Sequence, residues 1–146
     1  EMLAVARRRS PLLQGAEAEA EHLPYPDRSQ DVVTIAFGIR NVTRMGDALA
    51  EIHRVLKPGG VFACLEFSTP RPWLAPAYRA WSATVIPALG TVIAGDTAAY
   101  RYLVQSIARF PPQAEFAAMI RAAGFERVTW HDFSFGIASM HVGWRV

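Results

Sequence analysis

The chain has 146 residues, of which 51% are hydrophobic and 19% are charged, so it has the length of one globular domain and is too apolar for a disordered chain. A formal net charge of +2, with the arginines dispersed and no basic stripe among stacking aromatic residues, argues against a nucleic-acid partner. The single cysteine, Cys64, excludes an intrachain disulfide and favours a reducing, cytoplasmic setting, with Cys64 in the core.

The first part of the chain carries weak signals. Residues 2–9 are typical of the end of a helix, residues 12–16 of a short strand, and residues 17–30 of a loop rich in acids and prolines. Glu1-Met2 leads straight into the helical pattern and no signal peptide is readable, which indicates an internal start.

The middle of the chain predicts an α/β unit. Residues 31–37 form an apolar, β-branched run, residues 45–56 repeat apolar side chains at helical spacing, and residues 61–67 form a second apolar run. Pro58 stops the helix and Gly59-Gly60 allow a tight turn. The spacing suits two parallel strands joined by a right-handed crossover.

The last part predicts helices and then a hairpin. We expect one or two broken helices over 70–95, helices over 98–110 and 113–123, and strands over 126–133 and 137–145. The uncharged stretch 80–95 is shorter than the roughly 20 residues that a membrane-spanning helix needs. Because two strands joined by a short connection pair in antiparallel fashion, the predicted fold is α/β, a mostly parallel sheet that ends in an antiparallel hairpin.

Ligands of open parallel sheets bind beyond the carboxyl ends of the strands. Those positions are residues 36–41 and 66–69 here. Ordinary connecting loops are the alternative interpretation, since the fold alone does not determine function.

Several motifs, in this order along most of the chain, resemble the ubiquinone/menaquinone biosynthesis C-methyltransferase family, within the Rossmann-like methyltransferases. They are residues 54–60 (RVLKPGG) with 65–68 (LEFS), 21–27 (EHLPYPD), 37–42 (FGIRNV), 96–103 (DTAAYRYL) and 136–143 (GIASMHVG). The resemblance implies transfer of a methyl group from S-adenosylmethionine to a ring carbon of a polyprenyl benzoquinol or a naphthoquinol such as demethylmenaquinol. It implies no metal, and the four histidines show no ligand-like spacing.

The same resemblance implies roles for individual residues. The family's cofactor-contacting positions fall on Glu19 and Ala20, where a side-chain acceptor and a backbone amide would meet the adenine, and on Ala36, which offers only its backbone. Glu19 could equally belong to a solvated acidic loop.

Arg40 and Asn41 are the residues that we predict to handle the substrate, with the guanidinium stabilising a phenolate. The alternative for Arg40 is an ion pair with an acid that fastens the loop. By the resemblance, Asp96, Tyr100 and Arg101 would line or close the quinol pocket.

The aromatic residues Trp73, Tyr78 and Trp81 fit either that pocket or the core. The prenyl tail of the substrate implies peripheral association with the inner membrane surface.

One part of the family pattern is missing. No glycine-rich loop between a strand and a helix occurs in the chain, nor the acid that follows it and binds ribose. Residues 1–146 are therefore expected to be the C-terminal part of a single methyltransferase domain that lacks its N-terminal strands. The alternative function is a noncatalytic fragment that forms homo-oligomers through the uncovered sheet and has little cofactor affinity. A nicotinamide oxidoreductase fits less well, because the hairpin and the family motifs oppose it.

Overall fold

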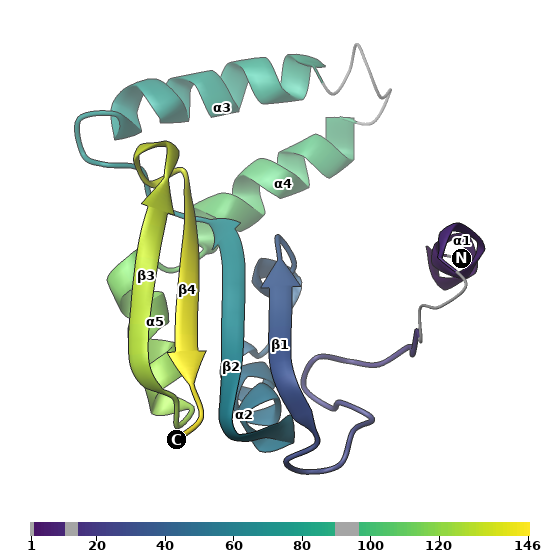
Figure 1. Cartoon of the computed structure of the whole chain (residues 1–146). Helices are drawn as coiled ribbons and strands as arrows, with labels where there is room; N and C mark the ends of the chain where they lie inside the picture. The colour runs from purple at the N-terminus through teal and green to yellow at the C-terminus, as the bar shows by residue number, and fades with distance from the viewer. Residues whose placement is uncertain (1, 11–14, 90–96) are drawn as a thin grey trace.

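The computed structural model describes residues 2–10, 15–89 and 97–146. Four described strands form a single sheet, with helices on one face and across the end at which β1 and β2 finish (Figure 1). The elements are α1 (Met2–Arg9), β1 (Gln30–Ala36), the 3-10 helix η1 (Ile39–Asn41), α2 (Met45–Val55), β2 (Leu56–Phe67), α3 (Ala75–Leu89), α4 (Thr97–Arg109), α5 (Gln113–Ala122), β3 (Glu126–Phe133), the 3-10 helix η3 (Ser134–Gly136) and β4 (Ala138–Trp144).

The strand order in the sheet is β1-β2-β4-β3. β1 pairs with β2 in parallel, while β4 runs antiparallel to both β2 and β3. Three of the four described strands therefore point the same way, and the hairpin forms the other side of the sheet. This arrangement confirms the predicted α/β architecture with its C-terminal antiparallel hairpin.

The largest difference from the expected elements lies at the start of β2. The strand begins at Leu56, and the predicted turn at residues 57–60 is an irregular part of the strand. The pairing with β1 shifts register there, and Gly59 takes a φ of +82°. A Cβ on Gly60 would lie 2.8 Å from the carbonyl oxygen of Lys57, so the close backbone approach requires glycine.

The N-terminal strand predicted at residues 12–16 lies largely outside the described residues, and Gly15 and Ala16 belong to no strand. α1 lies apart from the sheet in Figure 1. No helix within the described ranges is both long and apolar enough to span a membrane.

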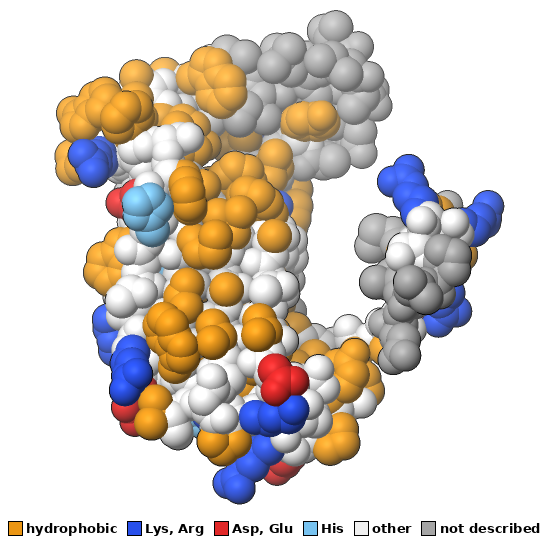
Figure 2. Space-filling view, viewed as in Figure 1, with side chains coloured by type: hydrophobic (Ala, Val, Ile, Leu, Met, Phe, Trp, Pro, Cys, Tyr) orange, Lys and Arg blue, Asp and Glu red, His pale blue; other side chains and the backbone are white. Residues whose placement is uncertain are grey.

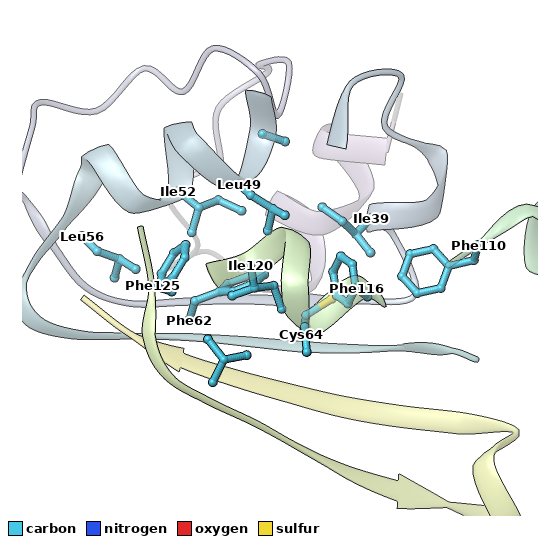
Figure 3. Close-up of a cluster of buried hydrophobic side chains, with 13 residues drawn as sticks. Ile39, Leu49, Ile52, Leu56, Phe62, Cys64, Phe110, Phe116, Ile120 and Phe125 are labelled. Carbon is cyan, nitrogen blue, oxygen red and sulfur yellow. The ribbon is translucent and has the colours of Figure 1, made fainter. Parts of the chain in front are cut away.

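The hydrophobic core lies between the sheet and the helices α2 and α5. Figure 3 shows Leu49 and Ile52 of α2 and Ile120 of α5 packed over Phe62 and Cys64 of β2. Side chains alternate along a strand, so every second residue of β2 enters this core. The apolar helical spacing of α2 is the sequence pattern that selects its buried face.

The opposite face of the sheet is apolar and open. α2 and α5 both lie behind the sheet in Figure 1, and Figure 2 shows hydrophobic side chains gathered over its front. Val32 of β1 is 56% exposed, and the β2 residues Val61, Ala63 and Leu65 are only partly buried. Within the described part of the chain, no helix covers this face.

α3 and α4 lie across the end of the sheet at which β1 and β2 finish (Figure 1). They follow β2 in the chain, and α4 contacts η1, which follows β1. The two helices thus enclose the region beyond the carboxyl ends of the parallel strands.

Candidate functional site

The loop that follows β1 turns sharply into η1. Phe37 adopts a φ of +54°, and its N–H donates to the carbonyl of Leu65 at 2.8 Å, which ties the loop to the end of β2. A left-handed conformation is unfavourable for a bulky residue, so this turn is held by its surroundings. η1 then carries Arg40 back over the carboxyl end of the sheet.

Arg40 forms a buried ion pair with Glu66. Its Nη1 lies 2.9 Å and 3.2 Å from the two carboxylate oxygens, and its backbone N–H donates to the same carboxylate at 3.4 Å. The side chains are 10% exposed for Arg40 and 1% for Glu66. The N–H of Phe67 also donates to the carboxylate at 2.9 Å, so several donors compensate the burial of its charge.

Further contacts hold the guanidinium of Arg40 in place. Its Nε donates to the hydroxyl of Ser106 on α4 at 3.3 Å, and its Nη1 donates to the carbonyl of Phe37. The guanidinium carbon lies 5.6 Å from the centre of the Phe67 ring, within the range of a cation–π contact. The ion pair that the sequence left open as an alternative for Arg40 is therefore present, and its proposed role toward the substrate stays a prediction.

The neighbouring residue Asn41 is exposed, and its Oδ1 accepts a hydrogen bond from the Tyr102 hydroxyl of α4 at 3.1 Å. Asn41 also borders a hollow of about 530 Å³ that Glu19 and Ala20 help to line. The structure thus brings together residues that the sequence assigned separately to cofactor and substrate.

Ala36 is placed differently. It ends β1 beside Leu65 on the open face of the sheet and does not line this hollow.

Two cavities flank α4. The first, of about 340 Å³, contains Arg40, Tyr102 and Ser106 among its lining residues. The second, of about 490 Å³, lies between α3, α4 and the segment that follows β2. Phe110 borders both, so α4 and this ring form the wall between them.

The larger cavity has mostly apolar walls with a few hydroxyl groups. Ser68 lies at the end of β2, and burial raises the pKa of the Tyr78 phenol, which is therefore neutral at physiological pH. The lining residues are Ser68, Thr69, Pro70, Ala75, Tyr78, Arg79, Ser82, Val104, Ile107, Ala108 and Phe110.

Other predicted pocket residues are less closely placed. Asp96 lies outside the described residues, while Tyr100 is half-buried and Arg101 exposed on α4. Neither Tyr100 nor Arg101 is among the described residues that line the three cavities above. Trp73 and Trp81 are exposed.

The sequence placed Glu66 and Ser68 at the predicted site, within residues 66–69, but did not predict their contacts, and Ser106 was missed. A carboxylate at an inward position of a buried strand is the signal that could have identified Glu66, because such a charge requires a partner.

Cys64 is fully buried in the core, as the sequence predicted. Burial, together with the nearby Glu66 carboxylate, raises the pKa of Cys64 to about 12, so the thiol stays protonated and inert. Among residues 2–10, 15–89 and 97–146 there is no group of three or more His, Cys, Asp or Glu residues arranged to hold a metal.

Comparisons with known proteins agree on the family. The model of the ubiE/COQ5 methyltransferase family matches residues 7–145. The chain is 60% identical over 146 residues to the ubiquinone/menaquinone biosynthesis C-methyltransferase UbiE of Rubrivivax gelatinosus and 52% identical over 152 residues to that of Bartonella tribocorum. Each match covers 99% of this chain and 58% of the relative, so the chain spans little more than half the length of these curated relatives.

Solved structures share the fold at lower identity. A SAM-dependent methyltransferase from Thermotoga maritima matches with a TM-score of 0.72 and 21% identity over 99% of this chain and 69% of its own. A SAM-dependent methyltransferase from Aquifex aeolicus matches with a TM-score of 0.61 and 16% identity, over 99% of this chain and 61% of its own. These likenesses show the Rossmann-like methyltransferase fold.

Proposed function

Because the chain belongs to the ubiE/COQ5 methyltransferase family, we propose that it takes part in S-adenosylmethionine-dependent C-methylation of a polyprenyl benzoquinol or demethylmenaquinol. The relatives named above carry names for this chemistry and are longer than the chain. The observation that carries the proposal is the buried Arg40–Glu66 pair, which holds a guanidinium at the carboxyl end of the sheet.

Arg40 acts on the substrate as an electrostatic group in this proposal. Free arginine is too weak a base to remove a proton at neutral pH. Its Nη2 makes no hydrogen bond within the part of the chain that the structure describes, so these N–H groups remain for a phenolate oxygen. A preorganised donor of this kind stabilises the charge that develops as the ring carbon attacks.

Asn41 supplies a second polar contact. Its Oδ1 is engaged by Tyr102, which leaves its amide N–H groups to bind the other oxygen of the quinol. Tyr100 and Arg101 of α4 line or close the quinol pocket in this proposal.

The residues that would hold the cofactor are Glu19, Ala20 and Ala36. The hollow beside Asn41 fits this role, since the carboxylate of Glu19 can accept from an adenine amino group next to the backbone N–H of Ala20. S-adenosylmethionine supplies an electrophilic methyl group on a sulfonium. The protein's part is to hold the ring carbon in line with that methyl group.

The second candidate function is a noncatalytic, self-associating fragment with little cofactor affinity. The open apolar face favours it, as does the outer edge of β1, which is unpaired among the described residues, because such surfaces bind other chains. Calorimetric titration with S-adenosylmethionine separates the two functions. Binding near micromolar, with methyl transfer to a short-chain demethylated quinol, supports the enzyme. Absence of both supports the fragment.

The role of Arg40 has its own test. Arg40→Lys keeps a positive charge beside Glu66 but loses the planar fork, so turnover should fall about a hundredfold. The affinity for S-adenosylmethionine should change less than twofold. Arg121→Lys is the matched control, because Arg121 lies on α5 and donates to the carbonyl of Val128. Unfolding of the Arg40→Lys protein would instead assign Arg40 a purely structural role.

A peripheral position at the inner membrane surface completes the proposal. A polyprenyl tail partitions into lipid, so the enzyme must reach the bilayer surface to meet it. Flotation with liposomes tests this point, and recovery of the protein only in the soluble fraction would contradict it.

A further inference from the structure

Two exposed aromatic side chains meet at the end of the sheet where β2 and β3 finish. Trp73, in the turn before α3, is 65% exposed, and Phe135, in η3, is 58% exposed. Their ring centres lie 5.4 Å apart in a T-shaped arrangement. Figure 2 shows hydrophobic side chains at the upper left, over the start of α3 and the tip of the β3–β4 hairpin, with Lys or Arg atoms beside them. We call this pair of residues the aromatic tip.

The backbone holds the aromatic tip in a fixed position. The N–H of Arg71 donates to the carbonyl of Phe135 at 3.0 Å. The N–H of Ser68 donates to the carbonyl of Ile137 at 2.9 Å, which ties the same two segments together. Phe135 takes a φ of +58°, a left-handed conformation that is unfavourable for a bulky residue. Burial of the ring does not compensate this strain, which points to a partner outside the chain.

The surroundings of the aromatic tip are cationic. No aspartate or glutamate occurs in the sequence from residue 67 to residue 95 or from residue 133 to residue 146. Arg71 and Arg79 are exposed, and neither forms an ion pair with a described residue. Asp132, the acid that precedes the second segment, is partly buried and accepts two side-chain hydrogen bonds. This end of the molecule therefore offers positive charge and apolar rings together.

These features restrict the kind of partner. Exposed aromatic rings, tryptophan above all, favour the interface between water and hydrocarbon in membranes, and arginine is attracted to anionic lipid headgroups. A protein interface of ordinary size needs about 800 Å² from each partner, far more than two rings and two cations present. A lipid surface needs no matching shape, so a small group of this composition suits it.

We propose that the aromatic tip, together with Arg71 and Arg79, is the surface by which the protein docks on an anionic lipid bilayer. Trp73 and Phe135 enter the headgroup region, and the two guanidinium groups contact lipid phosphates. This inference deepens the proposed function and rests on it only for the reason that the protein meets a bilayer. Docking through the tip turns the end of the sheet, and not its open face, toward the membrane.

The test is cosedimentation of the protein with vesicles, which needs no methyl transfer. Vesicles of phosphatidylcholine alone are compared with vesicles in which about one third of the lipid is phosphatidylglycerol. Trp73→Ser should weaken binding to the anionic vesicles about tenfold, because it removes apolar surface from the contact. Arg71→Gln should weaken that binding about fivefold and leave binding to phosphatidylcholine unchanged.

Each variant has a matched control far from the aromatic tip. Tyr25→Ser removes a 41% exposed ring from the loop before β1, and Arg127→Gln removes an exposed arginine near the start of β3. Both controls should bind the anionic vesicles within about twofold of the unaltered protein. Trp73→Ser and Arg71→Gln replace exposed side chains, so both should unfold at the temperature of the unaltered protein.

Several results would overturn the inference. They are failure of the unaltered protein to bind anionic vesicles and equal losses in a variant and its control. An equal loss in Val32→Lys would also overturn it, because the contact would then lie on the open face of the sheet. A changed oligomeric state of Trp73→Ser with unchanged vesicle binding would make the tip a contact between protein chains.

The outcomes also separate this inference from the proposed reaction. Vesicle binding that depends on the aromatic tip, in a protein that transfers no methyl group, would support the inference and refute the reaction. Methyl transfer to a short-chain quinol by a protein that binds no vesicles would support the reaction and refute the inference.

Discussion

At the scale of single residues, Glu66 determines how Arg40 is presented. A carboxylate that is 1% exposed has lost its hydration, and it is compensated by the guanidinium and by two backbone N–H groups. The pair therefore behaves as one unit, and each member depends on the other. Residues that act on a ligand from such a unit need no reorganisation when charge develops.

Replacing one member of this ion pair should lower the free energy of unfolding more than replacing both. Arg40→Leu leaves the Glu66 charge buried without its cation and should lower the free energy of unfolding by about 3 kcal/mol. Arg40→Leu/Glu66→Leu should recover more than half of that loss. Urea unfolding measures both values.

The exposed pair of Lys57 and Asp31 provides the comparison. Its side chains are 45% and 79% exposed, so Lys57→Leu should change the free energy of unfolding by less than about 0.5 kcal/mol. Equal losses for Arg40→Leu and for the double variant would show that the buried pair is not coupled.

At the scale of elements, α2 fastens the loop that carries the proposed cofactor contacts. Glu51 accepts the N–H of Leu23 at 2.9 Å, and hydrogen bonds from Arg54 and Leu23 lower its pKa to about 2. Arg54 in turn donates to the carbonyls of Leu23 and Tyr25 and pairs with Asp27. The segment from Leu23 to Asp27 is thus held by two adjacent turns of one helix.

Arg54→Ala should release this segment while α2 persists. The guanidinium supplies most of the side-chain contacts, so the Leu23 amide should exchange its hydrogen about tenfold faster in the variant. Hydrogen exchange followed by mass spectrometry measures this rate.

Arg44→Ala is the matched control, because the exposed Arg44–Asp47 pair does not touch residues 23–27. Unchanged exchange at Leu23 in the Arg54 variant would show that the Glu51 carboxylate and the backbone hold the loop without Arg54.

At the scale of the whole molecule, one face of the sheet is packed and the other is open. α2 and α5 cover the core side, whereas hydrophobic side chains of β1, β2 and β4 lie on the front in Figure 2. β1 is also the outer strand of the described sheet. An apolar face beside an unpaired edge is a surface that another polypeptide can cover.

The protein with this sequence should self-associate at micromolar concentration, and Val32→Lys should shift it toward the monomer. Val32 lies on the open face of the edge strand, so a lysine there adds charge at the contact. Sedimentation velocity measures the shift. Ala50→Lys, on the exposed side of α2, serves as the control. A monomer at all concentrations, or equal effects of both lysines, would refute association through this face.

The local sequence pattern predicted most helices and strands because the spacing of apolar residues within each one reflects its own geometry. The helix expected at residues 45–56 is α2 (Met45–Val55), the strand expected at 31–37 is β1 (Gln30–Ala36), and the hairpin differs by a residue or two. The predicted start of β2, at residue 61 rather than Leu56, was wrong for a physical reason. Lys57 to Gly60 extend the strand because Arg145, distant in sequence, exchanges backbone hydrogen bonds with Gly59 and Gly60.

The sequence by itself determined the fold class and the family, since apolar periodicity and the order of the motifs are properties of the chain read in one dimension. Only the tertiary structure decided which side chains contact one another at the candidate site. Arg40 and Glu66 are 26 residues apart and Arg40 and Ser106 are 66 apart, and pairing at such separations depends on how the elements pack. The Ser68 hydroxyl, which has no partner in the part of the chain that the structure describes, is likewise recognised only from the packed molecule, because burial and satisfaction of a polar group depend on its neighbours.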